Sequence, residues 1–390
     1  MAWIQVLLLC ASAARAVPAP PLEVVIYAGP HKTGSSTLEN AVLSDRHGVC
    51  KLLELKDNFA IPTKVPGQFK GAKSHANIVA ALVSDFPAVQ ESWLWLLRFA
   101  RDAFAQGRSL LLASENFSSI FRLPERIKLL VMALKEVGYK TVRVILTHRR
   151  VSEKLQSEHS EQFMASHRPI RNVNAYQPIV DWIVRRDPHA EIKYMQTIAV
   201  SEAYAAVGAE ASVLDLHKLH IHNETSLPTA FICEHLRAPS TCAMLRSGSM
   251  ERASHKSITV RFVKKNVRPR GLALLYDLVY AAAAKSGLQQ LDGVRAVAAL
   301  EALNVRSRPE LAIRIRCLPV PALARVWNAT VAEEVALLGQ PLGDAELGAL
   351  RANFDVKAAG MCSADLDATL AAREWAAPIA IAIRQGTEEL

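Results

Sequence analysis

Short runs of mostly apolar and β-branched residues, each followed by polar residues, recur along the first half of the chain. Three of them span residues 22–28, 109–113 and 141–147, and a fourth, shorter run spans 213–216. Because a strand buried on both faces carries apolar side chains at every position, these runs predict central strands of a parallel sheet. The mixed stretch 47–53 is assigned to a short second strand of the same sheet.

Segments with helical periodicity lie between these runs. Residues 89–105 place Trp93 and Leu96 on one face, and residues 124–137 begin with a proline and end just before Gly138. Helices are likewise predicted at 74–84, from 151 onward, at 176–184, at 194–207 and over most of the chain beyond 271. The alternation of strand and helix predicts the α/β class, with a doubly wound parallel sheet and right-handed crossovers.

The segment after the first strand has more polar chemistry than a turn requires. Its sequence is GPHKTGSST over residues 29–37, with Lys32, Gly34 and four hydroxyl side chains, before helical periodicity resumes at Leu38. Free backbone N–H groups and the positive end of the helix dipole then converge on one place, where Lys32 adds a positive charge. An N-cap needs only one hydroxyl, so this composition predicts a phosphate-binding loop.

The position of the lysine distinguishes between kinds of phosphate loop. In the nucleoside-triphosphate loop G-x-x-x-x-G-K-[ST] the lysine follows the second glycine, whereas Lys32 precedes Gly34. The string HKTGSST instead resembles the 5′-phosphosulfate loop of sulfotransferases that use 3′-phosphoadenosine 5′-phosphosulfate (PAPS), and most of all the Golgi carbohydrate branch. The lysine order also disfavours a nucleotide kinase, as does the lack of an evident carboxylate motif for Mg²⁺.

A second part of the same family pattern follows the run at 141–147. Arg149 stands where that strand ends, and Ser157 lies eight residues later on the predicted helix. In the family an arginine and a serine with this spacing hold the 3′-phosphate of the cofactor. Arginine suits that role because its planar guanidinium meets phosphate oxygens with two hydrogen bonds. Two matching motifs in the right order make the resemblance specific, and it implies a P-loop-type three-layer fold.

The resemblance assigns roles to these residues. The lysine would stabilise the leaving 5′-phosphate oxygen, and the cofactor would be held by Lys32, Thr33, Gly34, Ser35, Ser36, Thr37, Arg149 and Ser157. Family members place a histidine or a glutamate as general base near the end of the third strand, where this chain has Glu115. Glu115 is therefore expected to activate the acceptor hydroxyl. The alternatives are a structural Glu115 paired with a cofactor-site arginine, or a base supplied by His31, Glu54 or His75.

Composition and charge narrow the range of partners. The 390 residues are 51% hydrophobic and 21% charged, which is typical of a globular protein with an ample core. The net charge of +9 favours anionic partners, but the basic residues are scattered and no nucleic-acid motif is present. An anionic nucleotide together with an acidic glycan acceptor accounts for this charge equally well. No CxxC motif or histidine-rich cluster indicates a metal site.

The two ends of the chain predict its cellular location and its domain boundaries. Residues 1–16 (MAWIQVLLLCASAARA) predict a secretory signal peptide, whose apolar part is too short to span a bilayer. The sulfotransferase-like domain is assigned to 17–300 and a helical C-terminal extension to 301–390. Without another candidate membrane span, a glycoprotein of the secretory lumen is expected, in the Golgi or secreted. N-glycosylation sequons stand at Asn116, Asn223 and Asn328, and the first is expected to stay bare because it adjoins Glu115.

Five cysteines remain after removal of the signal peptide, which is too few for a disulfide scaffold. The favoured pairs are Cys233–Cys242, which closes a short loop, and then Cys317–Cys362. One thiol is left over. Sequence alone does not fix this connectivity.

Two functions from different classes follow from these observations. The first is an active PAPS-dependent sulfotransferase that modifies a hydroxyl, most naturally on a carbohydrate. The alternative is a non-catalytic anion- or glycan-binding protein on the same fold. The presence of Lys32, Arg149 and Ser157 together favours the enzyme, because a binding protein does not need both halves of a cofactor site.

Overall fold

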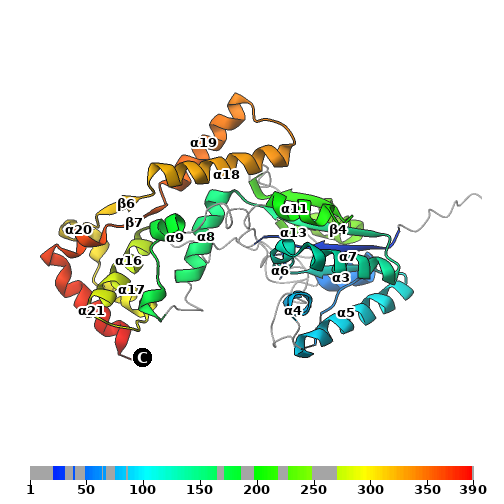
Figure 1. Cartoon of the computed structure of the whole chain (residues 1–390), viewed down its shortest axis with the longest axis horizontal. Helices are drawn as coiled ribbons and strands as arrows, with labels where there is room; N and C mark the ends of the chain where they lie inside the picture. Colours follow the sequence, from blue (N-terminus) through cyan, green and yellow to red (C-terminus); the bar gives the residue numbers. More distant parts are fainter. Residues whose placement is uncertain are drawn as a thin grey trace, which may run out of the picture.

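The computed structural model describes residues 21–30, 38–39, 49–63, 65–66, 75–84, 87–164, 171–185, 197–217, 227–247 and 270–388. These residues form two lobes (Figure 1). The sheet lobe is built around a parallel β-sheet, and the helical lobe contains the C-terminal helices. Helices α8 (Val151–Met164) and α18 (Val320–Leu338) belong to the helical lobe and reach from it toward the sheet lobe.

The sheet contains five parallel strands in the order β2-β3-β1-β4-β5. The strands are β1 (Glu23–Tyr27), β2 (Phe59–Ala60), β3 (Ser109–Ala113), β4 (Thr141–His148) and β5 (Glu210–Asp215). Strand β1 lies at the centre, with Tyr27 opposite Ala113 of β3 and Ile145 of β4. The prediction of an α/β fold with a doubly wound parallel sheet is confirmed.

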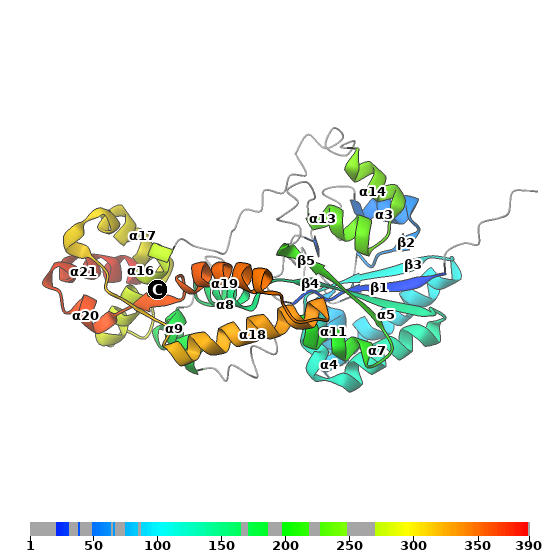
Figure 2. The same cartoon turned by 90° about the horizontal axis from the view of Figure 1, so that it is seen from above.

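Helices cover both faces of the sheet, which gives three layers (Figure 2). One face packs against α3 (Val49–Lys56), α13 (Leu227–Ala230), the π-helical turn η4 (Phe231–His235) and α14 (Pro239–Arg246). The other packs against α4 (Ala76–Val83), α5 (Pro87–Ala105), α7 (Pro124–Val137) and α11 (Thr197–Ala205). Alternation along β1 explains the two cores, because Val25 and Tyr27 face the first layer while Val24 and Ile26 face the second.

Two sequence-based strand assignments differ from the structure. The stretch 47–53 is wrong as a strand, because α3 begins at Val49 and its buried residues Val49, Cys50 and Leu53 have helical spacing. The second strand is instead the two-residue β2. Strand β5 begins at Glu210 rather than at 213. It has a single neighbour, β4, and an edge strand tolerates the polar residues that hid its beginning.

The helical lobe surrounds a core of its own. It combines α8 and α18 with α9 (Ile179–Arg185), α16 (Arg270–Lys285), α17 (Gly293–Ala302), α19 (Asp344–Ala358), α20 (Leu366–Leu370), α21 (Ala376–Thr387) and the antiparallel pair β6 (Ile315–Cys317) and β7 (Cys362–Ala364). Leu300, at the predicted boundary between 17–300 and 301–390, is buried in this core. Where the chain divides into domains stays a prediction.

The cysteine pairing is as expected from the sequence. Disulfides join Cys233 to Cys242 in the sheet lobe and Cys317 to Cys362 in the helical lobe. The second links β6 to β7 at positions that face each other across the ladder. The remaining thiol among the described residues, Cys50, is on α3 and is buried against the sheet.

A buried carboxyl group stands inside the helical lobe. Asp277 of α16 is 3% exposed, and its oxygens accept hydrogen bonds from the Tyr176 hydroxyl (2.7 Å) and the Ala364 N–H (2.8 Å). Burial raises the pKa of Asp277 to about 7, because these two hydrogen bonds and nearby Arg316 only partly compensate for the lost hydration.

This shift predicts that the protein becomes less stable as the pH rises from about 4 to 7. The unfolded chain releases the Asp277 proton near pH 3.8, whereas the folded chain keeps it until about pH 7, so this range costs about 4 kcal/mol of unfolding free energy. In Asp277→Asn, whose amide oxygen can still accept from the Ala364 N–H and whose amide nitrogen can donate to the Tyr176 hydroxyl, that loss should largely disappear. Chemical denaturation at several pH values measures it, with exposed Asp102→Asn as control. An unchanged pH profile in Asp277→Asn would contradict the shift.

Candidate functional site

The topology places a crevice at the carboxyl end of β1. The chain leaves β1 toward the face covered by α3, whereas it passes from β3 to β4 through α7 and from β4 to β5 through α11, on the opposite face. In open α/β sheets, ligands bind at such a switch point, outside the carboxyl ends of the strands. The ends of β1, β3 and β4 therefore form the candidate site.

The backbone at the end of β1 is fastened to both neighbouring strands. The Ala28 N–H donates to the Ile145 carbonyl (3.0 Å), and the Tyr27 carbonyl accepts from the Ser114 N–H (3.1 Å). Gly29 follows at a point where a Cβ would lie 2.3 Å from the Tyr27 hydroxyl and 2.4 Å from the Thr147 hydroxyl. Only glycine fits there, so the chain leaves the sheet along a fixed path.

The predicted phosphate loop is not among the residues that the structure describes. His31, Lys32, Thr33, Gly34, Ser35, Ser36 and Thr37 lie outside the described residues. Its flanks are described: Pro30 and Leu38 are buried, and the buried Glu39 accepts a hydrogen bond from the Glu115 N–H (2.9 Å). The residues just beyond the loop are thereby held at the end of β3.

The polar cluster after β3 stands beside this anchor. Ser114 is fully buried and its hydroxyl accepts from the Asn116 N–H (3.2 Å). The half-buried Glu115 begins the short helix α6 (Asn116–Ser119), and its carbonyl accepts from the Ser118 hydroxyl. The structure therefore brings Glu115 to the switch point, one strand away from the end of β1.

The other candidates for the general base among the described residues are His75 and Glu54. His75 is buried, and its Nε2 lies 2.6 Å from the Pro62 carbonyl while its Nδ1 accepts from the Ala113 N–H (2.9 Å). Burial lowers the pKa of His75 to about 4. Both ring nitrogens are thus used to fix the end of β3, which removes His75 as a base. Glu54 is half-buried on α3.

Arg149 lies where predicted, at the carboxyl end of β4. Its Nε donates to Glu153 Oε2 (3.0 Å), one turn along α8. Glu153 also contacts Lys357 of α19 (3.2 Å) and His217 after β5 (3.9 Å). Burial alone would raise the pKa of Glu153, but His217, Arg149 and Lys357 lower it overall. Glu153 is therefore a carboxylate that contacts all three of these side chains.

Ser157 is on α8 and is buried, with 5% of its surface exposed. It lies eight positions after Arg149, and the helical part of this span, residues 151–157, rises about 9 Å along the axis. A single ligand that touched both residues would have to lie along the first two turns of α8.

A second, largely buried cluster lies beside this site. We call Glu333 and Glu334 of α18 the acid pair. Glu333 Oε1 lies 3.4 Å from Lys154 Nζ and also accepts from the Thr197 N–H. Glu334 Oε1 accepts from His148 Nε2 (3.1 Å) and Arg150 Nε (3.2 Å). The acid pair therefore fastens α18 to the end of β4 and to the start of α8.

The pKa shifts in this cluster follow from burial and pairing. Burial lowers the pKa of Lys154, and Glu333 offsets part of this effect. For Glu334, burial would raise the pKa, but hydrogen bonds from His148 and Arg150 lower it to about 2. Glu334 is therefore a carboxylate at neutral pH.

Sequence reasoning missed most of these partners. Glu153 stands four residues after Arg149, and this spacing on a predicted helix signals an ion pair. The acid pair carried no comparable signal, because Glu334 is separated from Arg150 by 184 positions in the sequence.

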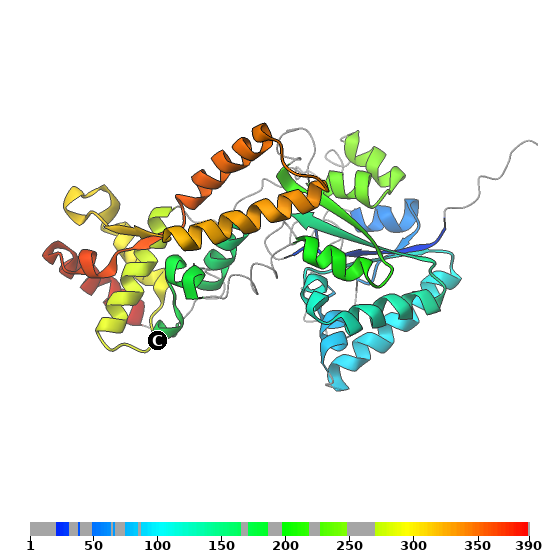
Figure 3. The same ribbon diagram turned by 45° about the horizontal axis from the view of Figure 1, so that its top comes forward.

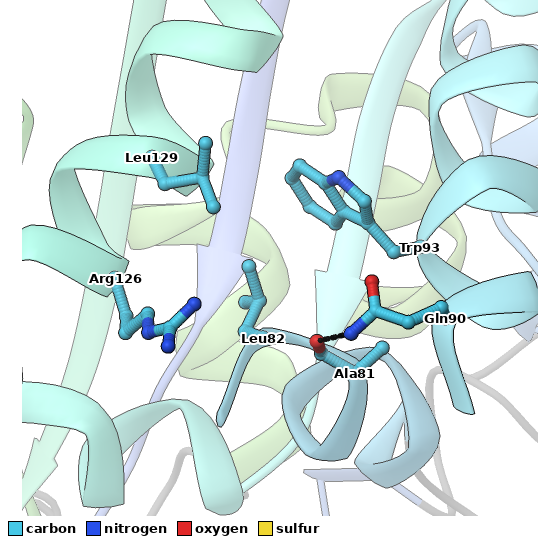
Figure 4. A pocket seen from close by; sticks show the side chains of 6 residues that line it. All are labelled: Ala81, Leu82, Gln90, Trp93, Arg126 and Leu129. Carbon is cyan, nitrogen blue, oxygen red and sulfur yellow. Dashed lines mark hydrogen bonds between the residues drawn. The ribbon is translucent and has the colours of Figure 1, made fainter. Parts of the chain in front are cut away.

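Two hollows among the described residues lie elsewhere. One, of about 190 Å³, is formed between α4, α5 and α7 and is lined by Ala81, Leu82, Gln90, Trp93, Arg126 and Leu129 (Figure 4). Gln90 spans one side of it and donates to the Ala81 carbonyl (2.9 Å). The other, of about 360 Å³, lies in the helical lobe between residues 305–313 and Trp375. Neither is lined by a residue of the strand ends.

The part of the chain that the structure describes contains no cluster of histidine, cysteine or acidic residues suited to a metal. In the same part, no helix is long and apolar enough to cross a membrane. No protein-family model, curated protein or solved structure matches this chain.

Proposed function

We propose that this protein is a sulfotransferase that moves a sulfuryl group from PAPS to an acceptor hydroxyl, on a carbohydrate, in the Golgi lumen or after secretion. The observation that carries the proposal is the pairing of β1 with β4 at the centre of the sheet. The HKTGSST segment follows β1 and Arg149 ends β4. Two motifs more than a hundred residues apart thus belong to neighbouring strand ends, as a P-loop-type nucleotide site requires.

The two motifs would hold opposite ends of one nucleotide. Lys32 and the backbone and hydroxyl groups of residues 33–37 would bind the 5′-phosphosulfate, and Arg149 with Ser157 would bind the 3′-phosphate. In the structure, Arg149 donates to Glu153. A phosphate dianion that approaches Arg149 must compete with this carboxylate, and Lys357 gives Glu153 another positive partner when it does.

In the reaction the acceptor oxygen attacks sulfur in line. A new S–O bond forms as the bond from sulfur to the 5′-phosphate oxygen breaks, and negative charge grows on that oxygen, where Lys32 would stabilise it. The acceptor proton passes to Glu115, which lies at the end of β3 and is tied through its N–H to Glu39. A glycan on Asn116 would obstruct this place, so we expect that sequon to be bare.

The first test is binding and transfer with the purified protein. 3′-Phosphoadenosine 5′-phosphate should raise its melting temperature, because a ligand that binds only the folded state stabilises it. Labelled sulfate from PAPS should then appear on members of a glycan panel rather than on tyrosine peptides or glycolipids. The absence of any thermal shift would overturn the proposal. Binding without transfer to any acceptor would favour the non-catalytic anion- or glycan-binding protein.

A further inference from the structure

One carboxylate oxygen of the helical lobe binds the residues on both sides of Arg149. Glu334 Oε1 accepts from His148 Nε2 at 3.1 Å and from Arg150 Nε at 3.2 Å. His148 is fully buried, and the side chains of Arg150 and Glu334 are 18% and 13% exposed. The arginine of the predicted 3′-phosphate site is therefore flanked in sequence by two residues that α18 holds in place.

The surrounding contacts extend this fixation to the rest of the β4–α8 junction. The Arg150 N–H donates to His217 Nε2 (3.3 Å), and the His217 N–H donates to Asp215 at the end of β5 (2.8 Å). Residues Val151 and Leu155 of α8 are buried in the core of the helical lobe. Figure 3 shows α18 running from that lobe to the carboxyl ends of the strands.

From this geometry we infer that Glu334 is a positioning residue for Arg149, so that the helical lobe completes the nucleotide site rather than merely covering it. The inference rests on the proposed function, because the nucleotide of that proposal supplies the phosphate that Arg149 would bind. Glu334 acts by fixing the backbone on either side of Arg149, and it does not itself touch the nucleotide.

Two physical effects of Glu334 have opposite signs, which makes the inference testable. As a nearby negative charge, Glu334 repels phosphate, so its neutralisation should tighten nucleotide binding if charge is all that matters. As a positioning residue it aligns Arg149, so its neutralisation should weaken binding. The weakening should be confined to ligands that carry the 3′-phosphate.

The experiment measures dissociation constants by calorimetry for 3′-phosphoadenosine 5′-phosphate and for adenosine 5′-phosphate. Glu334→Gln should bind the first about 10-fold more weakly, the size expected for a misaligned charged hydrogen bond, and the second as wild type does. A general loss of structure would weaken both nucleotides alike. Glu310→Gln, an exposed glutamate of the same lobe, should change neither and serves as the matched control.

A double mutant tests whether Glu334 acts through Arg149. In the Arg149→Ala background, Glu334→Gln should cause no further loss of affinity for 3′-phosphoadenosine 5′-phosphate. An additive loss, equal affinity in Glu334→Gln and wild type, tighter binding, or equal weakening of both nucleotides would overturn the inference and leave the proposed function standing. If wild type binds neither nucleotide, the proposed function falls and this inference with it.

Discussion

Replacing Lys32 by alanine is expected to lower kcat for sulfate transfer from PAPS by about 10²–10³-fold, with a smaller change in KM. The reason is that negative charge on the leaving phosphate oxygen develops only in the transition state, where a positioned cation contributes most. Steady-state transfer of labelled sulfate to a glycan acceptor measures it. Lys51→Ala, which removes an exposed lysine of α3, is the matched control and should leave both constants unchanged.

Arg149→Ala is expected to change the other kinetic constant, KM, more than kcat. The 3′-phosphate keeps its charge throughout the reaction, so losing its arginine should mainly raise KM for PAPS, by about 10–100-fold. The expected result is therefore a lower kcat in Lys32→Ala, at the phosphosulfate end of the nucleotide, and a higher KM in Arg149→Ala, at the 3′-phosphate end. Wild-type kinetics in both variants would show that the two motifs do not form one nucleotide site.

How well the sequence predicted the fold depended on how each element is buried. Strands β3 and β4 could be located to within a residue because their sequences are mostly apolar, and helix α7 because Pro124 and Gly138 mark its ends. Helix α3 was mistaken for a strand because its eight residues, with apolar Val49, Cys50, Leu52 and Leu53, are too few for periodicity to separate a strand from a helix. The two-residue β2 is too short to show any period.

The residues of the candidate site also differ in whether the sequence could predict their positions. Glu115 and Arg149 could be predicted because they follow apolar runs whose carboxyl ends must share one edge of the sheet. The contacts that occupy both ring nitrogens of His75 could not be predicted, since its partners Pro62 and Ala113 belong to separate segments. The acid pair is beyond local reasoning for a stronger reason. It lies on α18, and no periodicity indicates that this helix reaches the strand ends.

Lys154 and Glu333 supply the second large effect, this time on stability. Both side chains are 1% exposed and their charged groups lie 3.4 Å apart. Lys154→Met should lower the unfolding free energy by about 3–5 kcal/mol, because it leaves the Glu333 carboxylate buried without its cation. Chemical denaturation measures the loss. Lys285→Met, in the exposed pair with Asp367, is the matched control, with an expected loss below about 1 kcal/mol.

The double variant Lys154→Met/Glu333→Gln separates the charge from the packing. Glutamine still offers an oxygen to the Thr197 N–H that now binds Glu333, while the unpaired charge is gone. The double variant should therefore be more stable than Lys154→Met alone, since an ion pair replaced as a whole avoids the cost of a lone buried charge. If the second substitution instead adds to the damage, the carboxylate must be stabilised by its other neighbours, Thr197 and His148, and Lys154 serves mainly to fill space between α8 and α18.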